Sequence, residues 1–434
     1  MKSSTTMYIL IGIIVVLAMV IIGILLYLNN QPEPTRGVEP LVEIDPMDPD
    51  SETWGINYPN QWSTFQKTES NSERTAYGGS DDFSKLEVDP RLVELFAGYG
   101  FSKDYNEDRG HMNSLTDVEG TARVGESTPG TCYSCKSSDN PGLWDQMGMA
   151  EYDLTPFMEL GDEIEHAIGC ANCHDAETME LIVTNPALEE ALQAQGKDWR
   201  EFTRQEMRTV VCANCHVEYY FKGDGKYLTF PWQDGTKIEN IADYYAELQF
   251  KDWEHPQSGA PMIKMQHPEY ELFTQNSTHY NAGVACADCH MPYTRDGAAK
   301  FSTHDVKSPL LNAENACGQC HTDVTYVTNR VSTIQNQVYE TMIATEDAIL
   351  SGIRAIEKAA AQPSVDTEQL DEARWLHREA QLRWDFISSE NSMGFHNPEE
   401  ALRILAAATD LARQAELKAV QAAGTPDIIQ SETN

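Results

Sequence analysis

Basic residues are scarce in this sequence. Among its 434 residues, 31 are Lys or Arg and 68 are Asp or Glu, which gives a formal net charge of −37 at pH 7. A nucleic-acid binder needs basic side chains to neutralise phosphates, so this class of protein is excluded. Hydrophobic residues make up 41% of the chain and aromatic residues 9%. These proportions are usual for globular proteins, so the acidity belongs to a folded chain.

A long run without a charge lies at the N-terminus. Met7–Leu28 covers 22 residues, enough for a helix to cross about 30 Å of hydrocarbon. We predict a transmembrane helix in an N-terminal membrane anchor at residues 1–30. The alternative is a cleaved signal sequence, although its apolar core is usually about 7–15 residues long. Lys2 before the run and acids after it place the rest of the chain outside the cytoplasm. Residues 31–53, rich in proline and acids, are expected to form an extended tether.

No cysteine stands outside a Cys-Xaa-Xaa-Cys pair. The ten cysteines form five pairs; histidine follows four of them and lysine follows the first. Cys-Xaa-Xaa-Cys-His is the attachment signal of haem c, in which two thiols bind the porphyrin covalently and the adjacent imidazole binds the iron. The five motifs are Cys132/Cys135/Lys136, Cys170/Cys173/His174, Cys212/Cys215/His216, Cys286/Cys289/His290 and Cys317/Cys320/His321.

Zinc and disulfide bonds are the alternatives for such pairs. A zinc ribbon does not require histidine as the next residue, and five pairs leave one pair without a partner. A disulfide across a two-residue gap closes a small redox-active loop and is a poor structural staple. We therefore predict five covalently bound haems c.

Eight histidines remain outside the motifs. Low-spin haems that carry electrons need a second axial ligand, commonly histidine, so four of the eight are enough. Lys136 marks a haem of another kind, because an amine must be neutral to bind iron. If the opposite face of that iron is vacant, it is a catalytic position. The alternative is a decayed attachment site with a solvated lysine.

One lysine motif followed by four histidine motifs resembles the ammonia-forming cytochrome c nitrite reductases, the pentahaem catalytic subunit of the cytochrome c-552 family. The resemblance extends from about Trp54 to the C-terminal helices. The lysine motif is confined to very few cytochromes. The segments that carry the resemblance are Arg109-Gly110-His111, Thr116-Asp117-Val118, Cys132–Lys136, Cys215–Tyr220, Phe230-Pro231-Trp232, Lys264–Tyr270 and Cys289–Pro292.

The resemblance implies roles for residues beyond the motifs. Arg123, Tyr219 and His267 match the family's active-site residues on the vacant side of the Lys136 haem. The distal ligands are matched by His111 for the haem at Cys212/Cys215, His304 for Cys170/Cys173, His396 for Cys286/Cys289 and His279 for Cys317/Cys320. Surface or packing positions are expected for His166, His255 and His377, with a haem propionate contact as the alternative for His166.

A calcium ion beside the active haem is also implied by the resemblance. The matching ligands are the carboxylate of Glu218, the backbone carbonyls of Tyr219 and Lys264, and the side-chain carbonyl of Gln266. This all-oxygen set suits a hard cation. An ordinary exposed acid and a loop amide are the alternatives for Glu218 and Gln266.

The expected fold is mainly α, a multihaem cytochrome c fold with haems packed in a helix-and-loop domain at residues 54–323 and long helices at 324–424. Apolar residues from Val327 to Ile356 recur at steps of three, four or seven, which predicts one long amphipathic helix. Two more helices are predicted at Thr367–Ser389 and Pro398–Ala423. We expect region 324–424 to form a homodimer, with an intramolecular bundle as the alternative. Residues 425–434 are expected to form a flexible tail.

The resulting hypothesis is an extracytoplasmic enzyme that reduces nitrite to ammonium with six electrons and also accepts hydroxylamine, nitric oxide or sulfite. Arg123, protonated His267, ferric iron and calcium would supply the local positive charge that an anion needs in so acidic a protein. Electrons are expected from a membrane quinol-oxidising multihaem cytochrome c. The rival hypothesis is a pure electron carrier, which would need no anion pocket beside Lys136.

Overall fold

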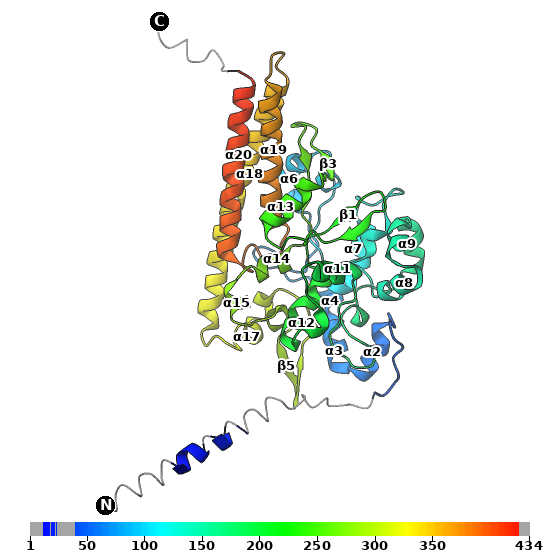
Figure 1. Ribbon diagram of the computed structural model, residues 1–434. Helices are drawn as coiled ribbons and strands as arrows, with labels where there is room; N and C mark the ends of the chain where they lie inside the picture. The colour runs from blue at the N-terminus through cyan, green and yellow to red at the C-terminus, as the bar shows by residue number, and fades with distance from the viewer. Residues whose placement is uncertain (1–11, 18, 22, 24–39, 425–434) are drawn as a thin grey trace, which may run out of the picture. The chain divides into compact units, whose positions relative to one another are not determined.

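The computed structural model describes residues 12–17, 19–21, 23 and 40–424 (Figure 1). The chain divides into a unit at Met1–Glu43 and a second unit at Ile44–Asn434. Most of the predicted Met7–Leu28 helix, and all of the predicted tail at 425–434, lie outside the described residues. Across the described ranges, no helix is both long enough and apolar enough to span a bilayer.

Three long helices form the C-terminal part of the second unit. They are α18 (Val324–Ala360), α19 (Thr367–Ser388) and α20 (Pro398–Ala422). The side chains of Asp323, Asp366 and Asn397 accept hydrogen bonds from the first backbone N–H groups, which is the preferred chemistry of a helix N-terminus. The two predicted helices at 367–389 and 398–423 are confirmed to within one residue at each end.

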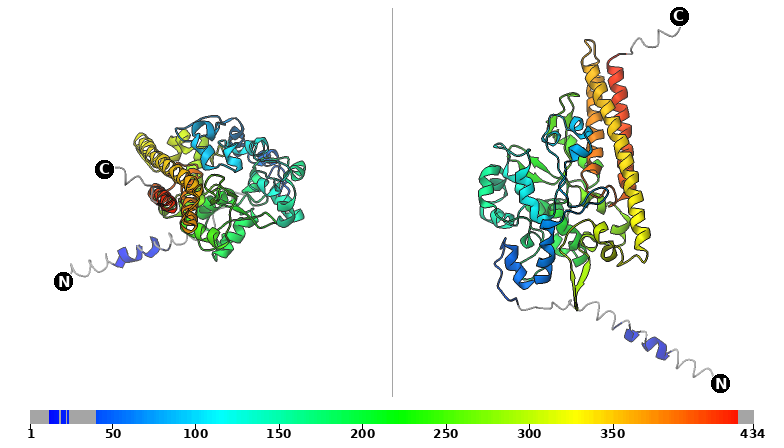
Figure 2. Two further views of the ribbon diagram at one scale, coloured as in Figure 1. Left: turned by 90° about the horizontal axis from the view of Figure 1, so that it is seen from above. Right: turned by 180° about the vertical axis from the view of Figure 1, so that it is seen from behind.

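The three helices pack side by side along one side of the unit, as both views in Figure 2 show. The predicted apolar stripe of α18 faces its two neighbours, because Ile349 and Ile353 are buried in one core with Ile404 and Leu405 of α20. Alanines dominate the buried face of α20, so backbones approach closely there. The stripe is thus occupied within the chain.

The rest of the second unit consists of short helices, turns and three small antiparallel sheets, as expected where no long periodic run exists. The α-helices are α2 (Ser51–Asn57), α3 (Pro59–Phe65), α4 (Lys67–Ser70), α5 (Lys85–Val88), α6 (Arg91–Leu95), α7 (Ser114–Gly120), α8 (Asn140–Met147), α9 (Met149–Leu154), α10 (Phe157–Leu160), α11 (Pro186–Ala194), α12 (Arg204–Val210), α13 (Ile238–Glu247), α14 (Glu269–Thr274), α15 (Thr278–Asn281), α16 (Cys286–His290) and α17 (Ala313–Ala316). The 3₁₀ turns are η1 (Gly100–Ser102), η2 (His111–Asn113), η3 (Gly130–Tyr133), η4 (Gly161–Glu163), η5 (Cys170–Asn172), η6 (Trp199–Glu201), η7 (Val211–Asn214) and η8 (Pro309–Asn312). The strand pairs are β1 (Tyr220–Lys222) with β2 (Tyr227–Thr229), β3 (Trp253–Glu254) with β4 (Pro261–Met262), and β5 (Tyr293–Asp296) with β6 (Ala299–Ser302).

The compact unit begins earlier than the sequence suggested. The tether was predicted to reach residue 53, but Ile44 is already buried against Trp54 and Ala171, and α2 starts at Ser51. Trp54 Nε1 also donates a hydrogen bond to the carbonyl oxygen of Asp48 at 2.9 Å. Proline and acid content alone therefore overestimated the length of the tether, because a single apolar residue is enough to dock the segment.

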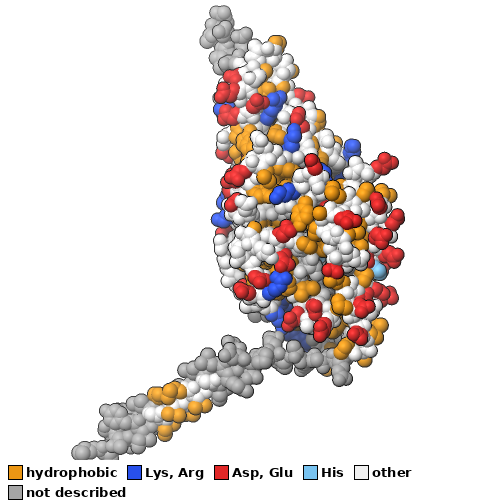
Figure 3. Space-filling model, turned by 45° about the vertical axis from the view of Figure 1, so that its right-hand side comes forward, with side chains coloured by type: hydrophobic (Ala, Val, Ile, Leu, Met, Phe, Trp, Pro, Cys, Tyr) orange, Lys and Arg blue, Asp and Glu red, His pale blue; other side chains and the backbone are white. Residues whose placement is uncertain are grey.

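Acidic side chains cover the surface in the mixed pattern expected where a protein meets water. In Figure 3 they are spread over the visible side, with fewer basic side chains and small apolar patches between them. The excess of acids therefore does not gather at one place on this face.

One acid of the bundle is buried. Glu346 of α18 is 1% exposed, and its Oε2 lies 3.1 Å from Nε of Arg91, which also pairs with Asp89. Burial, followed by the neighbouring carboxylate of Asp89, raises the pKa of Glu346 to about 9 despite Arg91. The carboxyl group is therefore protonated at neutral pH in the folded protein.

Because Glu346 is protonated in the folded protein, we expect the free energy of unfolding to depend on pH. An unfolded glutamic acid ionises near pH 4, so between about pH 5 and pH 8 the folded state holds one more proton than the unfolded state. The free energy of unfolding should therefore fall as pH rises in this window, by at most about 1.4 kcal/mol per pH unit from this group. Glu346→Gln should remove that part of the slope in guanidinium unfolding of the holoprotein. Glu340→Gln, on the exposed side of the same helix, is the control; equal slopes in both variants would contradict the assignment.

Candidate multihaem active site

Each cysteine motif begins in a tight turn. The backbone N–H of His174, His216 and His321 donates to the carbonyl oxygen of the first cysteine of its motif, at 3.0, 2.9 and 2.9 Å. Lys136 differs, because its N–H donates to Tyr133 at 2.8 Å. The turns bring both sulfurs and the following side chain together locally, as covalent haem attachment requires.

The two alternatives for the cysteines find no support. None of the ten, all of which are described, forms a disulfide. A zinc ribbon would gather two pairs into one cluster, but over the described ranges no three His, Cys, Asp or Glu side chains form a metal-binding group. The pairs thus remain separate sites.

The fifth motif lies at the surface of the helix-and-loop domain. Cys320 is exposed, whereas the other nine cysteines are partly buried. The residues that follow it, as far as Asp323, are exposed as well, because the chain runs along the surface there before α18 begins. Three other predicted site residues are also exposed: Arg123, His216 and His321.

Exposure leaves the local geometry of the fifth motif unchanged. The Cys320 backbone N–H donates to the Cys317 carbonyl oxygen at 3.1 Å, which closes the same turn as in the second and third motifs. A thioether bond requires two neighbouring thiols and not their burial, so Cys320 stays a predicted attachment residue.

The motifs lie next to one another in a defined order. Cys135 of the first motif interacts with Cys215 of the third through their side chains, and Cys212 of the third interacts with Cys286 of the fourth. Cys289 of the fourth is within electrostatic reach of Cys317 and Cys320 of the fifth. Cys173, in the second motif, is within electrostatic reach of Cys215. The order in space is first, third, fourth and fifth, with the second beside the third.

Four pairs of histidine rings have nearly the same spacing. Two imidazole nitrogens bound about 2 Å from one iron, on its opposite faces, place the ring centres roughly 6 Å apart. Each motif histidine has its predicted partner at this distance. The pairs are His111–His216 at 6.4 Å, His174–His304 at 6.3 Å, His279–His321 at 6.5 Å and His290–His396 at 6.2 Å. The residues present therefore fit four haems with two imidazoles each.

The remaining histidines have no motif histidine left to pair with, although the His267 ring lies at a similar distance from His216. His255 and His377 are fully buried and linked through Ser258, whose hydroxyl lies 3.0 Å from His377 Nδ1. They are packing residues, one of the two roles expected for them. His166 Nδ1 lies 2.9 Å from a carboxylate oxygen of Asp139. His267 lies 6.5 Å from His216, next to the pair that His216 forms with His111.

Lys136 lies within electrostatic reach of His267, and both of them, with Arg123, act on the buried Asp108. The Lys136 carbonyl oxygen accepts a hydrogen bond of 2.6 Å from Ser114 Oγ. Burial would raise the pKa of the nearby Asp108, but Lys136, then His267, and more weakly Arg123, lower it to about 2. Asp108 is therefore ionised and interacts electrostatically with three of the predicted catalytic residues. Sequence analysis missed Asp108 and Ser114, since neither lies in a recognisable motif.

The side chain of Arg123 is held against an aromatic ring. Its guanidinium carbon lies 4.1 Å from the centre of the Phe101 ring, and its Nε donates to Thr121 Oγ1 at 3.1 Å. Gly100 leaves room for the methylene groups of the Arg123 side chain, because a Cβ at position 100 would come within 3.3 Å of Arg123 Cγ. The Phe101 ring also lies 4.9 Å from the ammonium group of Lys264.

The protonation states of the other two candidates follow from burial. Burial lowers the pKa of His267 to about 4, even though Glu269 and Asp108 raise it. His267 is thus neutral at pH 7, which corrects the expectation that its protonated form supplies positive charge. Burial also raises the pKa of Tyr219 well above its usual value. Both side chains are therefore neutral hydrogen-bond donors, and Arg123 is the cation of the group.

Three of the four predicted calcium ligands converge on one loop. Glu218 is completely buried, and its two carboxylate oxygens accept hydrogen bonds from Tyr245 Oη at 2.8 Å and the Gln266 backbone N–H at 2.6 Å. The Gln266 side-chain amide donates to the Lys264 carbonyl oxygen at 3.1 Å. Burial raises the pKa of Glu218 well above its usual value, so a neighbouring cation would offset the cost of its charge. These donors fit a calcium ion.

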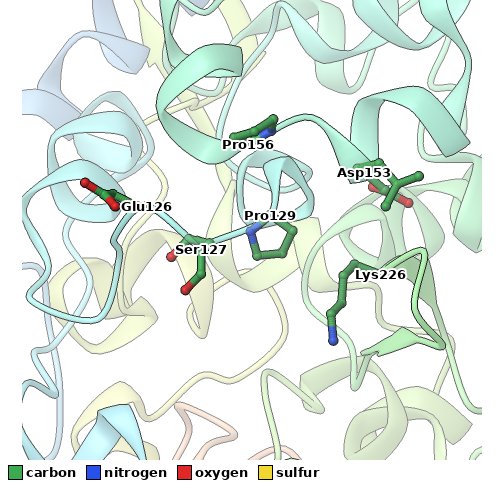
Figure 4. Close-up of a pocket in the computed structure, with 8 residues that line it drawn as sticks. Glu126, Ser127, Pro129, Asp153, Pro156 and Lys226 are labelled. Carbon is green, nitrogen blue, oxygen red and sulfur yellow. The ribbon is translucent and has the colours of Figure 1, made fainter.

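A small cavity of about 150 Å³ lies apart from these residues. Figure 4 shows Pro129, Asp153 and Lys226 on its wall, together with Glu126 and Pro156. None of the predicted site residues lines it. Its volume is also far too small for a porphyrin, so it is not part of the haem site.

Residues inside the motifs fasten them to one another, a role that sequence analysis missed. Asn172 donates to the carbonyl oxygen of Ser137 at 2.8 Å, which joins the second motif to the first. Asn214 accepts hydrogen bonds from the backbone of Thr184 and Asn185. Asp288 accepts from Arg208 Nη2 at 2.7 Å. Their shared position before the second cysteine was the signal that could have revealed them.

Comparison with known proteins places the chain in a family. The sequence profile of the cytochrome c552 family matches residues 50–433. The chain belongs to the cytochrome c552 family. It is 41% identical over 388 residues to cytochrome c-552 of Parabacteroides distasonis, covering 86% of this chain and 77% of the relative. For cytochrome c-552 of Bacteroides fragilis strain YCH46 the identity is 40% over 394 residues, covering 87% and 78%.

A solved structure extends the similarity to three dimensions. The cytochrome c nitrite reductase of Desulfovibrio desulfuricans ATCC 27774, whose catalytic subunit has two calcium sites, matches with a TM-score of 0.84 and 33% identity. The match covers 91% of this chain and 90% of that structure. The predicted cytochrome c552 family, its oxidoreductase class and its mainly helical multihaem architecture are therefore confirmed.

The contact between Arg123 and Phe101 gives a prediction for this cytochrome c552. Phe101→Leu keeps an apolar side chain but removes the ring face, so the guanidinium should become more mobile. We expect its modification by phenylglyoxal, followed by peptide mass spectrometry of the holoprotein, to speed up roughly three- to tenfold. Phe96→Leu removes a ring that lies 5.3 Å from Lys264 in the same aromatic group and serves as the control. Equal rates in both variants would mean that Phe101 does not hold Arg123.

Proposed function

We propose that this cytochrome c552 reduces nitrite to ammonium with six electrons at a haem ligated by Lys136. The observation that carries the proposal is the contrast between four histidine pairs spaced at 6.2–6.5 Å and the first motif, which ends in lysine. Arg123, Tyr219 and His267 lie near the lysine motif instead of a second axial ligand. Similarity to a cytochrome c nitrite reductase over nine-tenths of the chain supports the same assignment.

The proposed cofactors are five haems c and calcium. The thioether links come from the ten motif cysteines, and the axial ligands are Lys136 and the four histidine pairs. When bound, the Lys136 haem supplies the iron that takes up the nitrite nitrogen and delivers electrons to it. The remaining four haems form a path along the motif order described above.

The chain's own residues orient the anion and supply protons. Arg123 provides the fixed positive charge that binds nitrite, and Phe101 and Thr121 hold its side chain in place. Neutral His267 donates a hydrogen bond to a nitrite oxygen, which polarises the N–O bond and prepares the oxygen to leave as water. Tyr219, which stays protonated, is a second proton donor. The overall reaction is NO₂⁻ + 8 H⁺ + 6 e⁻ → NH₄⁺ + 2 H₂O.

Calcium is proposed beside this site, on Glu218, Gln266 and the carbonyl oxygens of Lys264 and Tyr219. It would neutralise the buried Glu218 and fix the backbone on both sides of the active site, at Tyr219 and next to His267. The related Desulfovibrio enzyme has two calcium sites in its catalytic subunit, which supports the proposal.

The partners and location follow from the same proposal. We infer a homodimer formed by the long helices, since Leu417 and Val420 of α20 are 56% and 46% exposed; sedimentation equilibrium measures its mass.

Electrons would come from a membrane quinol-oxidising multihaem cytochrome c. Because haem c is attached outside the cytoplasm, the enzyme would act there, and the Met7–Leu28 segment would anchor it to the membrane.

Two other functions remain as rivals. Sulfite is an anion like nitrite, and hydroxylamine and nitric oxide are small neutral nitrogen compounds; all three are proposed as further substrates of the same site. A pure electron carrier would not need Arg123, Tyr219 and His267 grouped around a lysine motif, and this grouping favours the enzyme.

The decisive test is spectroscopy combined with product analysis. The holoprotein should contain one high-spin haem in five that binds nitrite or cyanide, and it should consume six reducing equivalents for each ammonium formed. A protein with only low-spin haems, unchanged by nitrite, would be a carrier.

Variants at His267 test the hydrogen bond that its neutral ring would donate. His267→Leu removes the donor and should lower kcat for nitrite by about 100- to 1000-fold, as for other donors to a developing charge. His267→Gln keeps an N–H donor without a titratable ring and should retain more activity. Haem spectra should be unaffected in both, and wild-type kinetics in His267→Leu would refute the role.

Calcium binding can be tested without an activity assay. Glu218→Gln removes the only proposed carboxylate ligand, so the calcium retained after dialysis against a chelator should fall at least tenfold, as measured by atomic emission. Glu340→Gln, on the exposed side of α18 and far from the proposed ligands in the chain, is the control. If Glu218→Gln keeps its calcium, the ion binds elsewhere.

A further inference from the structure

One axial histidine is in contact with a buried carboxylate. Glu390 is completely buried in the loop between α19 and α20, and its Oε2 lies 3.1 Å from Nδ1 of His396. The same carboxylate accepts hydrogen bonds from Ser392 Oγ at 2.7 and 2.9 Å and from the Gly394 backbone N–H at 2.6 Å. A buried anion with this many donors is held in one orientation.

The loop is built to keep Glu390 in place. Gly394 has a φ of +75°, and a Cβ there would come within 2.8 Å of Val338 on α18. Only glycine therefore allows the loop to turn and direct its N–H to Glu390. The hydroxyl of Ser392 also accepts the backbone N–H of His396 at 2.9 Å. The carboxylate and the imidazole are thus positioned by the same short segment.

The other proposed axial histidines, all of them described, lack such a contact. The Nδ1 atoms of His174, His290 and His304 lie 2.9, 3.2 and 3.0 Å from backbone carbonyl oxygens. His216 Nδ1 also faces a carboxylate, that of Glu269, but at 3.8 Å. The haem at Cys286/Cys289 is therefore distinguished by a carboxylate within hydrogen-bond distance, 3.1 Å, of a ligand's Nδ1.

We propose that Glu390 is a redox-tuning residue that lowers the reduction potential of the haem at Cys286/Cys289. A carboxylate accepts the Nδ1–H of the imidazole more strongly than a carbonyl oxygen does and makes the ring a better electron donor to the metal. It also places a negative charge near the iron. This charge stabilises the ferric state more than the ferrous state, because ferric iron carries one more positive charge. The proposal rests on the proposed pairing of His290 and His396.

The position of this haem gives the shift a functional consequence. The fourth motif lies between the third and the fifth, so an electron that travels between the outer motif and the active site passes it. A lowered potential makes this haem a weaker electron acceptor than it would be without Glu390, so Glu390 would affect how electrons are shared between the fifth motif and the active site.

The test is a spectroelectrochemical titration of the holoprotein carrying Glu390→Gln. Glutamine keeps an acceptor for the Nδ1–H but removes the charge. The reduction potential of one low-spin haem should rise by roughly 59 mV, which corresponds to a tenfold change in its one-electron redox equilibrium. The potentials of the other haems should stay unchanged. Glu390→Asp keeps the charge at a longer distance, so the shift should have the same direction and a smaller size. Glu399→Gln, on the exposed first turn of α20, is the control.

Two results would overturn the proposal. Potentials in Glu390→Gln that match the wild type, or an equal shift in Glu399→Gln, would show that Glu390 does not tune this haem. Haem content and the low-spin electron paramagnetic resonance signals verify that the variants are assembled. If the wild-type protein lacks the signals of four low-spin haems, the proposed ligation is refuted. Nitrite turnover is measured separately. A failure of the Glu390 proposal can therefore be distinguished from a failure of the proposed function.

Discussion

The spacing between paired imidazoles is the constraint on which the rest of the structure depends. In each pair one ring comes from a cysteine motif and the other from a segment distant in the chain. His304, for example, follows the hairpin β5–β6 and meets His174, and His396 comes from the loop between two C-terminal helices and meets His290. A ring distance of about 6 Å is also the separation that two imidazoles bound to opposite faces of one iron would have, so a haem between the rings would join the two segments. Short helices and turns suffice here because each haem would join two of them.

Charge is the second constraint, and it acts locally. The net charge of −37 is distant and screened by salt, whereas Lys136, Arg123 and Asp108 interact within one site. Asp108 reduces the positive charge there, and neutral His267 adds none, so Arg123 is left as the side chain that attracts an anion. The site therefore depends on holding one guanidinium well, which is the role of Phe101, Thr121 and the space left by Gly100.

Much of this could be predicted from the sequence, and the limits have physical causes. The long helices followed from apolar periodicity, because α18–α20 bury one face along their whole length. The four histidine pairs that the structure brings together followed from the motifs and the family resemblance. The charge of His267 did not, since its pKa depends on burial by segments far away in the chain. The tether was predicted too long because its composition does not show that Ile44 docks against Trp54.

The helix bundle and the active site are also physically connected. Asp385 of α19 is completely buried and accepts hydrogen bonds from Lys264 Nζ at 3.0 Å and the Met265 backbone N–H at 2.8 Å. These residues lead directly to Gln266 and His267, and the Lys264 ammonium lies over the ring of Phe101, which holds Arg123. Since removing one partner of a buried ion pair is costly, α19 cannot shift without disturbing both the proposed calcium loop and the guanidinium. The long helices therefore hold the residues around the proposed active site as well as packing against one another.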